Sequence, residues 1–250
     1  MTDYSKVLHP LGDDIGSVQL LDSMGTDKTI VSAARVSYLA DNYGTPFDNK
    51  DARLIKHLLT ANHGSVLEHC TFTFRISSPL FIIQQILRHR VGFSFNQSSR
   101  RYTVLDEDKS YTPITFRVQS KDNKQASVPA TLENISAFTK FPTVDMWNAS
   151  NNKIYQDTWR FAFSKYEHLL ANGVAREQAR GVLPVCQYGE FYLTANLRSL
   201  LHFLELRLED HAQYEIRLLA NSMLELIEPV YPEAIKIWKE LHPNLTGVII

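Results

Sequence analysis

The segment from Cys70 to Arg90 constrains the fold more than any other part of this 250-residue chain. At its start, apolar and polar residues alternate, which is the period of a half-buried strand. The apolar positions of this predicted strand are Cys70, Phe72, Phe74 and Ile76.

A helix is predicted to follow this strand. Ser78 and Pro79 indicate its start, because a serine oxygen can cap free N–H groups and proline suits the first helical position. We expect the helix to run to about Arg90. Its surface is mostly apolar, and a buried helix cannot leave polar groups unpaired. Its polar stripe, which therefore needs partners, consists of Gln84, Gln85, Arg88 and His89.

Helical and strand periods alternate along the rest of the chain, which predicts a mixed α/β (α+β) fold. Further helices are expected at 51–62, 155–172 and 197–208, and 214–241 is expected to hold helices broken near Pro229 and Pro232, with a strand at 191–194. Prolines and polar residues at 109–154 predict a long loop or an insertion. We expect a single domain, 1–250, with a mixed or antiparallel sheet packed against long helices. No Gly-x-Gly-x-x-Gly or phosphate-loop motif occurs, so a non-Rossmann fold is expected.

Composition narrows the class of protein. The chain carries 26 basic and 27 acidic side chains, whereas a general nucleic-acid binder is expected to have a basic excess. Two distant cysteines, Cys70 and Cys186, do not suggest a disulfide framework. The residues from Met1 to Lys6 show no apolar h-region, and no stretch approaches the length needed to span a bilayer. We expect a cytoplasmic protein that binds neither nucleic acid nor membrane.

The segment from Arg88 to Tyr102 concentrates groups that can bind an anion. After the end of the predicted helix we expect it to form a loop that contains glycine and serine. It holds four arginines together with serines and amides, whose donors could converge on one ligand. A solvated loop with scattered charges is the plain alternative. Another alternative is a platform for single-stranded RNA that stacks bases on Phe93, Phe95 and Tyr102, although the near-zero net charge argues against it.

The same segment resembles the signature of the flavin-dependent thymidylate synthases, in which Arg-His-Arg is followed by a serine and then Arg-Tyr. Other blocks similar to those of the family occur in family order, and together they cover most of the chain apart from 109–154 and the extreme termini. These blocks are Ala34-Arg35-Val36-Ser37, His63-Gly64-Ser65 with Glu68-His69, Gln85 before Arg88, Ala179-Arg180 before Leu183-Pro184, Asn196-Leu197-Arg198-Ser199, and Arg207 with His211-Ala212-Gln213-Tyr214-Glu215-Ile216.

The resemblance implies that FAD, reduced by NADPH, supports transfer of a one-carbon unit from methylenetetrahydrofolate to dUMP. It also implies a homotetramer with sites between subunits. The residues implied to bind dUMP are Gln85, Arg88, Gln97, Ser99, Arg101, Arg180 and Arg207, of which Ser99, Arg101 and Arg207 are the implied catalytic residues. The residues implied to border FAD are Ser37, His63, Ser65, Arg88, His89, Arg90, Asn96, Asn196, Arg198, His202, Leu206 and His211.

Two positions depart from the family pattern. His202 stands where the family has an asparagine, and the spacer after Arg90 is one residue longer than usual. Aligning the flanking Asn96-Gln97 and Arg101-Tyr102 selects Ser99 and Arg101, whereas a fixed spacer selects Ser98 and Arg100. We favour the first register. The serine is assigned to substrate binding, because arginine cannot act as the base that a serine nucleophile needs.

Two other chemistries are disfavoured by the residues themselves. His63, Glu68 and His69 have metal-ligating side chains, but their spacing matches no standard zinc motif, so we expect no metal. Both cysteines are expected to be small core residues, and the sequence that surrounds the activated cysteine of the cysteine-dependent thymidylate synthases is not found.

Overall fold

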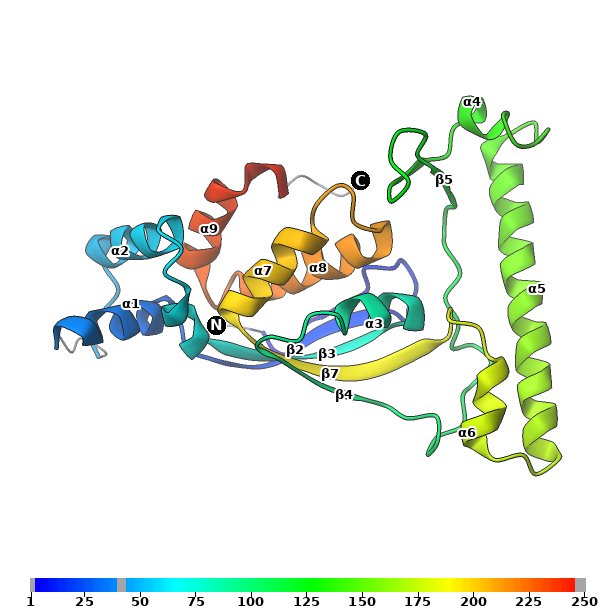
Figure 1. The fold of residues 1–250 in the computed structure, drawn as a ribbon, viewed down its shortest axis with the longest axis horizontal. Helices are drawn as coiled ribbons and strands as arrows, with labels where there is room; N and C mark the ends of the chain where they lie inside the picture. The colour runs from blue at the N-terminus through cyan, green and yellow to red at the C-terminus, as the bar shows by residue number, and fades with distance from the viewer. Residues whose placement is uncertain (1–2, 40–43, 246–250) are drawn as a thin grey trace.

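A computed structural model describes residues 3–39 and 44–245 of the chain (Figure 1). Within these residues, a five-stranded antiparallel sheet has the order β1-β2-β3-β7-β4. The strands are β1 Val7–Leu8, β2 Ser17–Met24, β3 Thr71–Pro79, β4 Phe93–Gln97 and β7 Tyr188–Asn196.

The predicted strand at 70–76 is confirmed as β3, the centre of the sheet. It pairs with β7 from Thr71↔Asn196 to Pro79↔Tyr188, so the strand extends past Ser78. The prediction that Ser78 caps a helix is therefore wrong. Its backbone pairs with Gly189 of β7 instead, and its hydroxyl oxygen is buried without a hydrogen-bond partner in the described chain.

Helices cover one face of the sheet. α3 Leu80–Ile86, α7 Leu197–Arg207 and α8 Tyr214–Ile227 lie above it in Figure 1, where they contribute to the main core with alternate residues of β3 and β7. Three more helices gather at one end of the sheet, namely α1 Asp27–Arg35, α2 Asn49–Thr60 and α9 Pro232–Leu241. The helices predicted at 51–62, 197–208 and 214–241 are confirmed within one or two residues at each end.

The opposite face of the sheet is polar. It carries a pair of threonine hydroxyls, Thr73 and Thr194, 2.9 Å apart, and an ion pair between Arg75 and Glu190 of 3.0 Å. A sheet with one apolar and one polar face is the pattern expected of antiparallel strands. Among the helices of the described chain, none is long and apolar enough to cross a membrane.

The long helix α5 Val144–Ala171 stands beside the sheet rather than on it (Figure 1). It packs with α6 Arg176–Ala179 and the 3₁₀-helix Arg180–Val182 around a second, smaller core. The Trp159 indole donates to the Glu107 carbonyl oxygen at 2.7 Å, which ties α5 to the chain that leaves β4. The buried members of this core are Leu105, Trp159, Phe163, Tyr166, Ala179, Leu183 and Cys186.

The helix expected to reach Arg90 ends at Ile86. The next amides bond three residues back, from Arg88 N to Gln85 O and from His89 N to Ile86 O, which tightens the last turn. The chain then reverses at Gly92, whose φ of +71° is open to glycine. A side chain there would also collide with Ser199.

The loop predicted after this helix is wrong for Phe93–Gln97, which forms β4 along β7. The prediction of a long loop at 109–154 is only partly correct. It contains the β5 Arg117–Gln119 and β6 Ser127–Pro129 hairpin, the short α4 Leu132–Ile135 and the start of α5. Helix α5 begins eleven residues before the predicted 155, because Thr143 caps it by accepting from Met146 N. Further 3₁₀-helices are Val36–Tyr38, Gly64–His69 and Pro243–Leu245.

Candidate functional site

A cavity of about 510 Å³ lies where the end of β4, the start of β7 and α6 meet. Three residues predicted to bind dUMP, Gln97, Ser99 and Arg180, come together in its wall from separate elements. The complete lining is Leu80, Gln97, Ser98, Ser99, Arg100, Glu177, Arg180, Gly181, Leu183, Gln187, Tyr188 and Gly189.

Strand pairing positions the first part of this wall. Gln97 is the last residue of β4 and lies on the same side of the strand as Phe93 and Phe95, because side chains alternate between faces. Ser98 N donates to Glu190 O at 2.8 Å, which continues the pairing one step further. The Ser98 hydroxyl accepts from Glu190 N at 3.3 Å.

A tight turn positions Ser99 and the two arginines that follow. Tyr102 N donates to Ser99 O at 3.0 Å, and the Ser99 hydroxyl accepts from Arg101 N at 3.3 Å. Arg100 points into the wall and donates to Tyr188 O at 2.8 Å, and burial lowers the pKa of its guanidinium. Arg101 does not line the cavity, and its Nη2 lies 3.3 Å from the Glu177 carboxylate.

Arg180 is the exposed cation of the cavity. Its guanidinium makes no hydrogen bond or ion pair within residues 3–39 and 44–245. Glu177 lies three residues earlier, at the spacing of one helical turn, so that a carboxylate stands beside the cations. Sequence reasoning missed Glu177, although its i, i+3 spacing from Arg180 could have indicated it. It also missed Gln187, which no local pattern marks.

A second group of predicted residues gathers between α3 and α7. Arg207 Nε donates to His89 Nε2 at 3.0 Å, so the neutral imidazole carries its proton on Nδ1. Burial, together with electrostatic interactions with Arg207 and His202, lowers the pKa of His89 to about 4. Gln85 Nε2 donates to Gln213 Oε1 at 2.6 Å. Gln85 and His89 of the polar stripe predicted on the buried helix are therefore paired.

A third group lies at the start of α7. Asn196 caps this helix by accepting from Ser199 N at 2.9 Å. Arg198 forms an ion pair of 2.6 Å with Glu68 of the 3₁₀-helix Gly64–His69, which also contains the predicted Ser65. The ring of His63, next to that helix, makes an edge contact with His57.

The remaining predicted residues are dispersed on the surface. Asn96 lies on the opposite side of β4 from Gln97, and Ser37 is exposed on Val36–Tyr38. The guanidinium groups of exposed Arg88 and Arg90 make no hydrogen bond or ion pair in the described part of the chain. The last three are His202, 3.5 Å from Glu205, Leu206, which is 45% exposed, and His211, whose Nδ1 is 3.0 Å from Asn123. A single chain thus separates the predicted site residues into groups.

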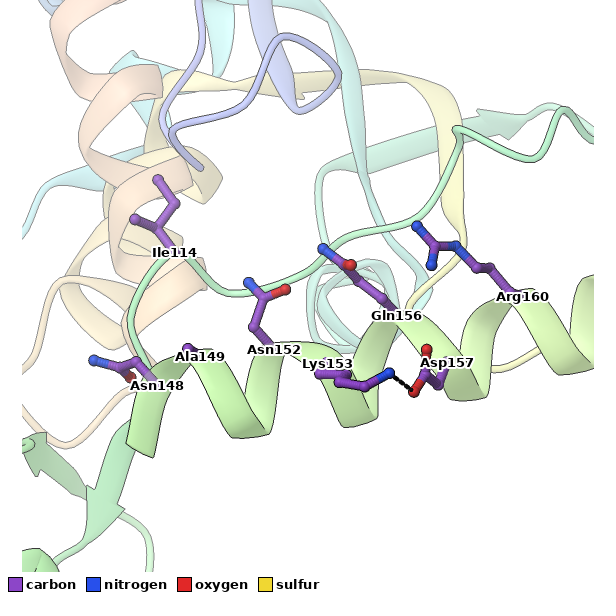
Figure 2. Close-up of a pocket in the computed structure, with 8 residues that line it drawn as sticks. All are labelled: Ile114, Asn148, Ala149, Asn152, Lys153, Gln156, Asp157 and Arg160. Carbon is purple, nitrogen blue, oxygen red and sulfur yellow. Dashed lines mark hydrogen bonds and ion pairs between the residues drawn. The ribbon is translucent and has the colours of Figure 1, made fainter. Parts of the chain in front are cut away.

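A larger cavity of about 590 Å³ runs along α5 (Figure 2). Its wall is one face of that helix, with Asn148, Asn152, Gln156 and Arg160 repeating every fourth residue, closed by Ile114. None of the predicted site residues lines it. We place the candidate site in the smaller cavity, because donors from several elements converge there.

The described residues contain no evident metal-binding site. No group of three or more histidine, cysteine, aspartate or glutamate side chains is arranged there to hold an ion. Cys70 and Cys186 are both buried, and burial raises the pKa of each thiol, that of Cys70 to about 12. Both thiols are therefore protonated and fit the predicted core role.

Residues 19–233 match the protein family described as thymidylate synthase complementing protein. A flavin-dependent thymidylate synthase of Thermus thermophilus is 41% identical over 227 residues, which cover 91% of this chain and 77% of that protein. The chain belongs to the flavin-dependent thymidylate synthase family. The family predicted from the sequence blocks is thereby confirmed.

Other members and a solved structure agree with this assignment. The flavin-dependent thymidylate synthase of Thermosipho africanus is 38% identical over 219 residues, covering 88% of this chain and 89% of that protein. The crystal structure of the UMP/dUMP methylase PolB from Streptomyces cacaoi, bound to 5-Br dUMP, superposes with a TM-score of 0.76. It is 30% identical and covers 89% of this chain and 94% of PolB. The expected mixed fold with an antiparallel sheet and long helices is the family fold.

Proposed function

We propose that this protein is a cytoplasmic flavin-dependent thymidylate synthase that methylates dUMP to dTMP. Methylenetetrahydrofolate is the carbon donor, and FAD reduced by NADPH is the hydride source. The observation that carries the proposal is the cavity in which Gln97, Ser99 and Arg180 meet. Amide, hydroxyl and guanidinium donors on one wall suit a phosphorylated nucleoside.

Arginine side chains would bind the nucleotide through the negative charge of its phosphate group. Arg180 is exposed and its guanidinium has no hydrogen-bond or ion-pair partner in the described chain, so it is available to a phosphate group. Arg101 is held by Glu177 through an ion pair in which both side chains are more than half exposed, and such pairs are weak. Arg101 can therefore exchange Glu177 for a bound anion at low cost.

The other dUMP residues, Gln85, Arg88 and Arg207, do not line this cavity. In a homotetramer they would complete the site from a neighbouring subunit, which is the arrangement that the family resemblance implied. Arginine suits this role because its fixed charge stabilises negative charge that develops on the uracil ring during attack.

The flavin would be held by the second and third groups of residues together with exposed Arg88 and Arg90. Their unpaired guanidinium groups fit a pyrophosphate, and the neutral His89 offers a flat, partly buried ring. When bound, FAD supplies the hydride chemistry, and the protein orients the nucleotide and excludes competing reactions.

Ser99 and Ser98 act in this scheme as hydrogen-bonding groups. Both hydroxyls already accept a backbone N–H, and arginine side chains flank them. Glu177 is the carboxylate of this cavity, and its Oε2 is engaged by Arg101. We therefore keep the serine in substrate binding and polarisation, with no nucleophilic step.

Purified protein tests the proposal directly. After incubation with FAD it should show a flavin spectrum that dUMP perturbs, and NADPH oxidation should depend on FAD and yield dTMP when methylenetetrahydrofolate is added. Protein that stays colourless and gives no calorimetric heat with FAD or dUMP would refute the proposal. Polynucleotide binding that falls steeply with salt would favour the RNA platform instead.

A further inference from the structure

Gln187 is a buried polar residue of the cavity wall. It is 6% exposed, and its side-chain amide makes no hydrogen bond within the described residues. Its backbone, in contrast, is fully used, because Leu80 N donates to Gln187 O at 3.0 Å and Gln187 N donates to Pro184 O at 3.1 Å. Buried amides in folded proteins are normally paired, so this one is available to a ligand.

The position of Gln187 indicates which part of a ligand it meets. It is buried, whereas Arg180 of the same cavity is exposed to solvent. Desolvating a phosphate dianion costs far more free energy than desolvating a flat, neutral ring, so the phosphate favours the exposed side and the ring favours the buried side. Leu80 and Leu183 also line the cavity and offer apolar surface to such a ring.

We propose that the side-chain amide of Gln187 recognises the imide edge of the uracil ring, while the phosphate of the nucleotide lies with Arg180 at the exposed side of the cavity. This inference rests on the proposed function. The amide carries a donor and an acceptor side by side, as uracil does at N3–H and the adjacent carbonyl. One Gln187 side chain can therefore accept from N3–H and donate to the carbonyl oxygen.

The test compares two ligands on FAD-loaded protein by calorimetry and competition. Gln187→Leu keeps most of the side-chain volume and removes both hydrogen bonds. We expect the Kd for dUMP to rise about ten- to thirtyfold, since each neutral hydrogen bond contributes roughly 1 kcal/mol. The Kd for 2-deoxyribose 5-phosphate, which lacks the base, should stay within about twofold of wild type.

Two further variants keep the outcome interpretable. Gln178→Leu removes an exposed glutamine of α6 that does not line the cavity, and should leave both affinities unchanged. If Gln187→Leu does not fold, Gln187→Asn is the alternative, because it retains the amide on a shorter side chain. It should weaken the binding of dUMP and leave that of 2-deoxyribose 5-phosphate unchanged.

The possible results separate the two proposals. Unchanged dUMP affinity in Gln187→Leu would overturn the role of Gln187, and so would an equal loss for both ligands, which would indicate a contact with the sugar phosphate or a structural role. Wild-type protein that binds neither FAD nor dUMP would instead overturn the proposed function.

Discussion

Arg180 and Arg207 are both predicted to bind dUMP, yet the structure treats them differently. Arg180 stands exposed at the cavity, and its guanidinium makes no hydrogen bond or ion pair in the described chain. Arg207 is partly buried at the end of α7, where burial lowers the pKa of its guanidinium and His89 accepts its Nε–H at 3.0 Å. One guanidinium thus has no hydrogen-bond partner among the described residues, and the other already contributes to the fold.

The local structure explains this difference. Arg180 begins a 3₁₀-turn after the four-residue helix α6, at the surface of the small core. Arg207 ends an eleven-residue helix that buries five residues in the main core, so its side chain leaves from a rigid, packed element. A buried cation needs a polar partner, because leaving it unpaired is costly.

Arg207→Ala should give the largest effect, because it acts on both fold and site. Removing the guanidinium leaves His89 Nε2 without its donor, which should lower the free energy of unfolding by about 1–3 kcal/mol. The affinity for dUMP should also fall by roughly ten- to a hundredfold. Urea denaturation and calorimetry measure the two effects. An unchanged free energy of unfolding would mean that the Arg207 side chain contributes no more to stability than that of Arg180.

Acid provides an independent check of the contact between Arg207 and His89. The folded-state pKa of His89 is about 4, below its ordinary value of 6.5, so the unfolded chain binds more protons between these values. The contribution of His89 to stability is therefore complete above pH 6.5 and is lost as the pH falls through about 4. His89→Gln should flatten this part of the stability profile, and an identical profile in wild type and variant would contradict the assignment.

Arg180→Ala should affect ligand binding alone. We expect dUMP to bind ten- to a hundredfold more weakly, because a charge-assisted contact is lost, while the free energy of unfolding changes by less than about 0.5 kcal/mol. Arg53→Ala, which removes an exposed arginine on α2, is the matched control and should change neither quantity. A clear loss of stability in the Arg180 variant would show that Arg180, like Arg207, contributes to the fold.

The variants Ser99→Ala and Ser98→Ala should give the smallest effects. Comparing them tests which serine of the cavity contacts the ligand. Both serines line the cavity. We expect Ser99→Ala to lower dUMP affinity or turnover by roughly two- to tenfold, the size of one neutral hydrogen bond, and Ser98→Ala to do less. Both are measured at saturating FAD. A larger loss for Ser98 would transfer the assignment to Ser98 and Arg100.

Local patterns predicted most of the elements and missed where some of them end. The alternation from Cys70 to Ile76 was enough for β3, and helical spacing was enough for α2 and α7. The existence of β4 depends on pairing with β7, about a hundred residues later in the chain. The end of α3 at Ile86 was also missed, four residues before the predicted end at Arg90. The start of α5 was missed because its asparagines and other polar residues resemble those of a loop.

The sequence by itself determined the family and the types of residue that a nucleotide site needs, because motif spacing survives in the linear order of the chain. Only the tertiary structure decided which of them meet. Gln97, Ser99 and Arg180 share a cavity because β4 pairs with β7 and the small core holds α6 beside them. The free amide of Gln187 also emerges only there, because its burial arises from long-range packing and not from its neighbours in the sequence.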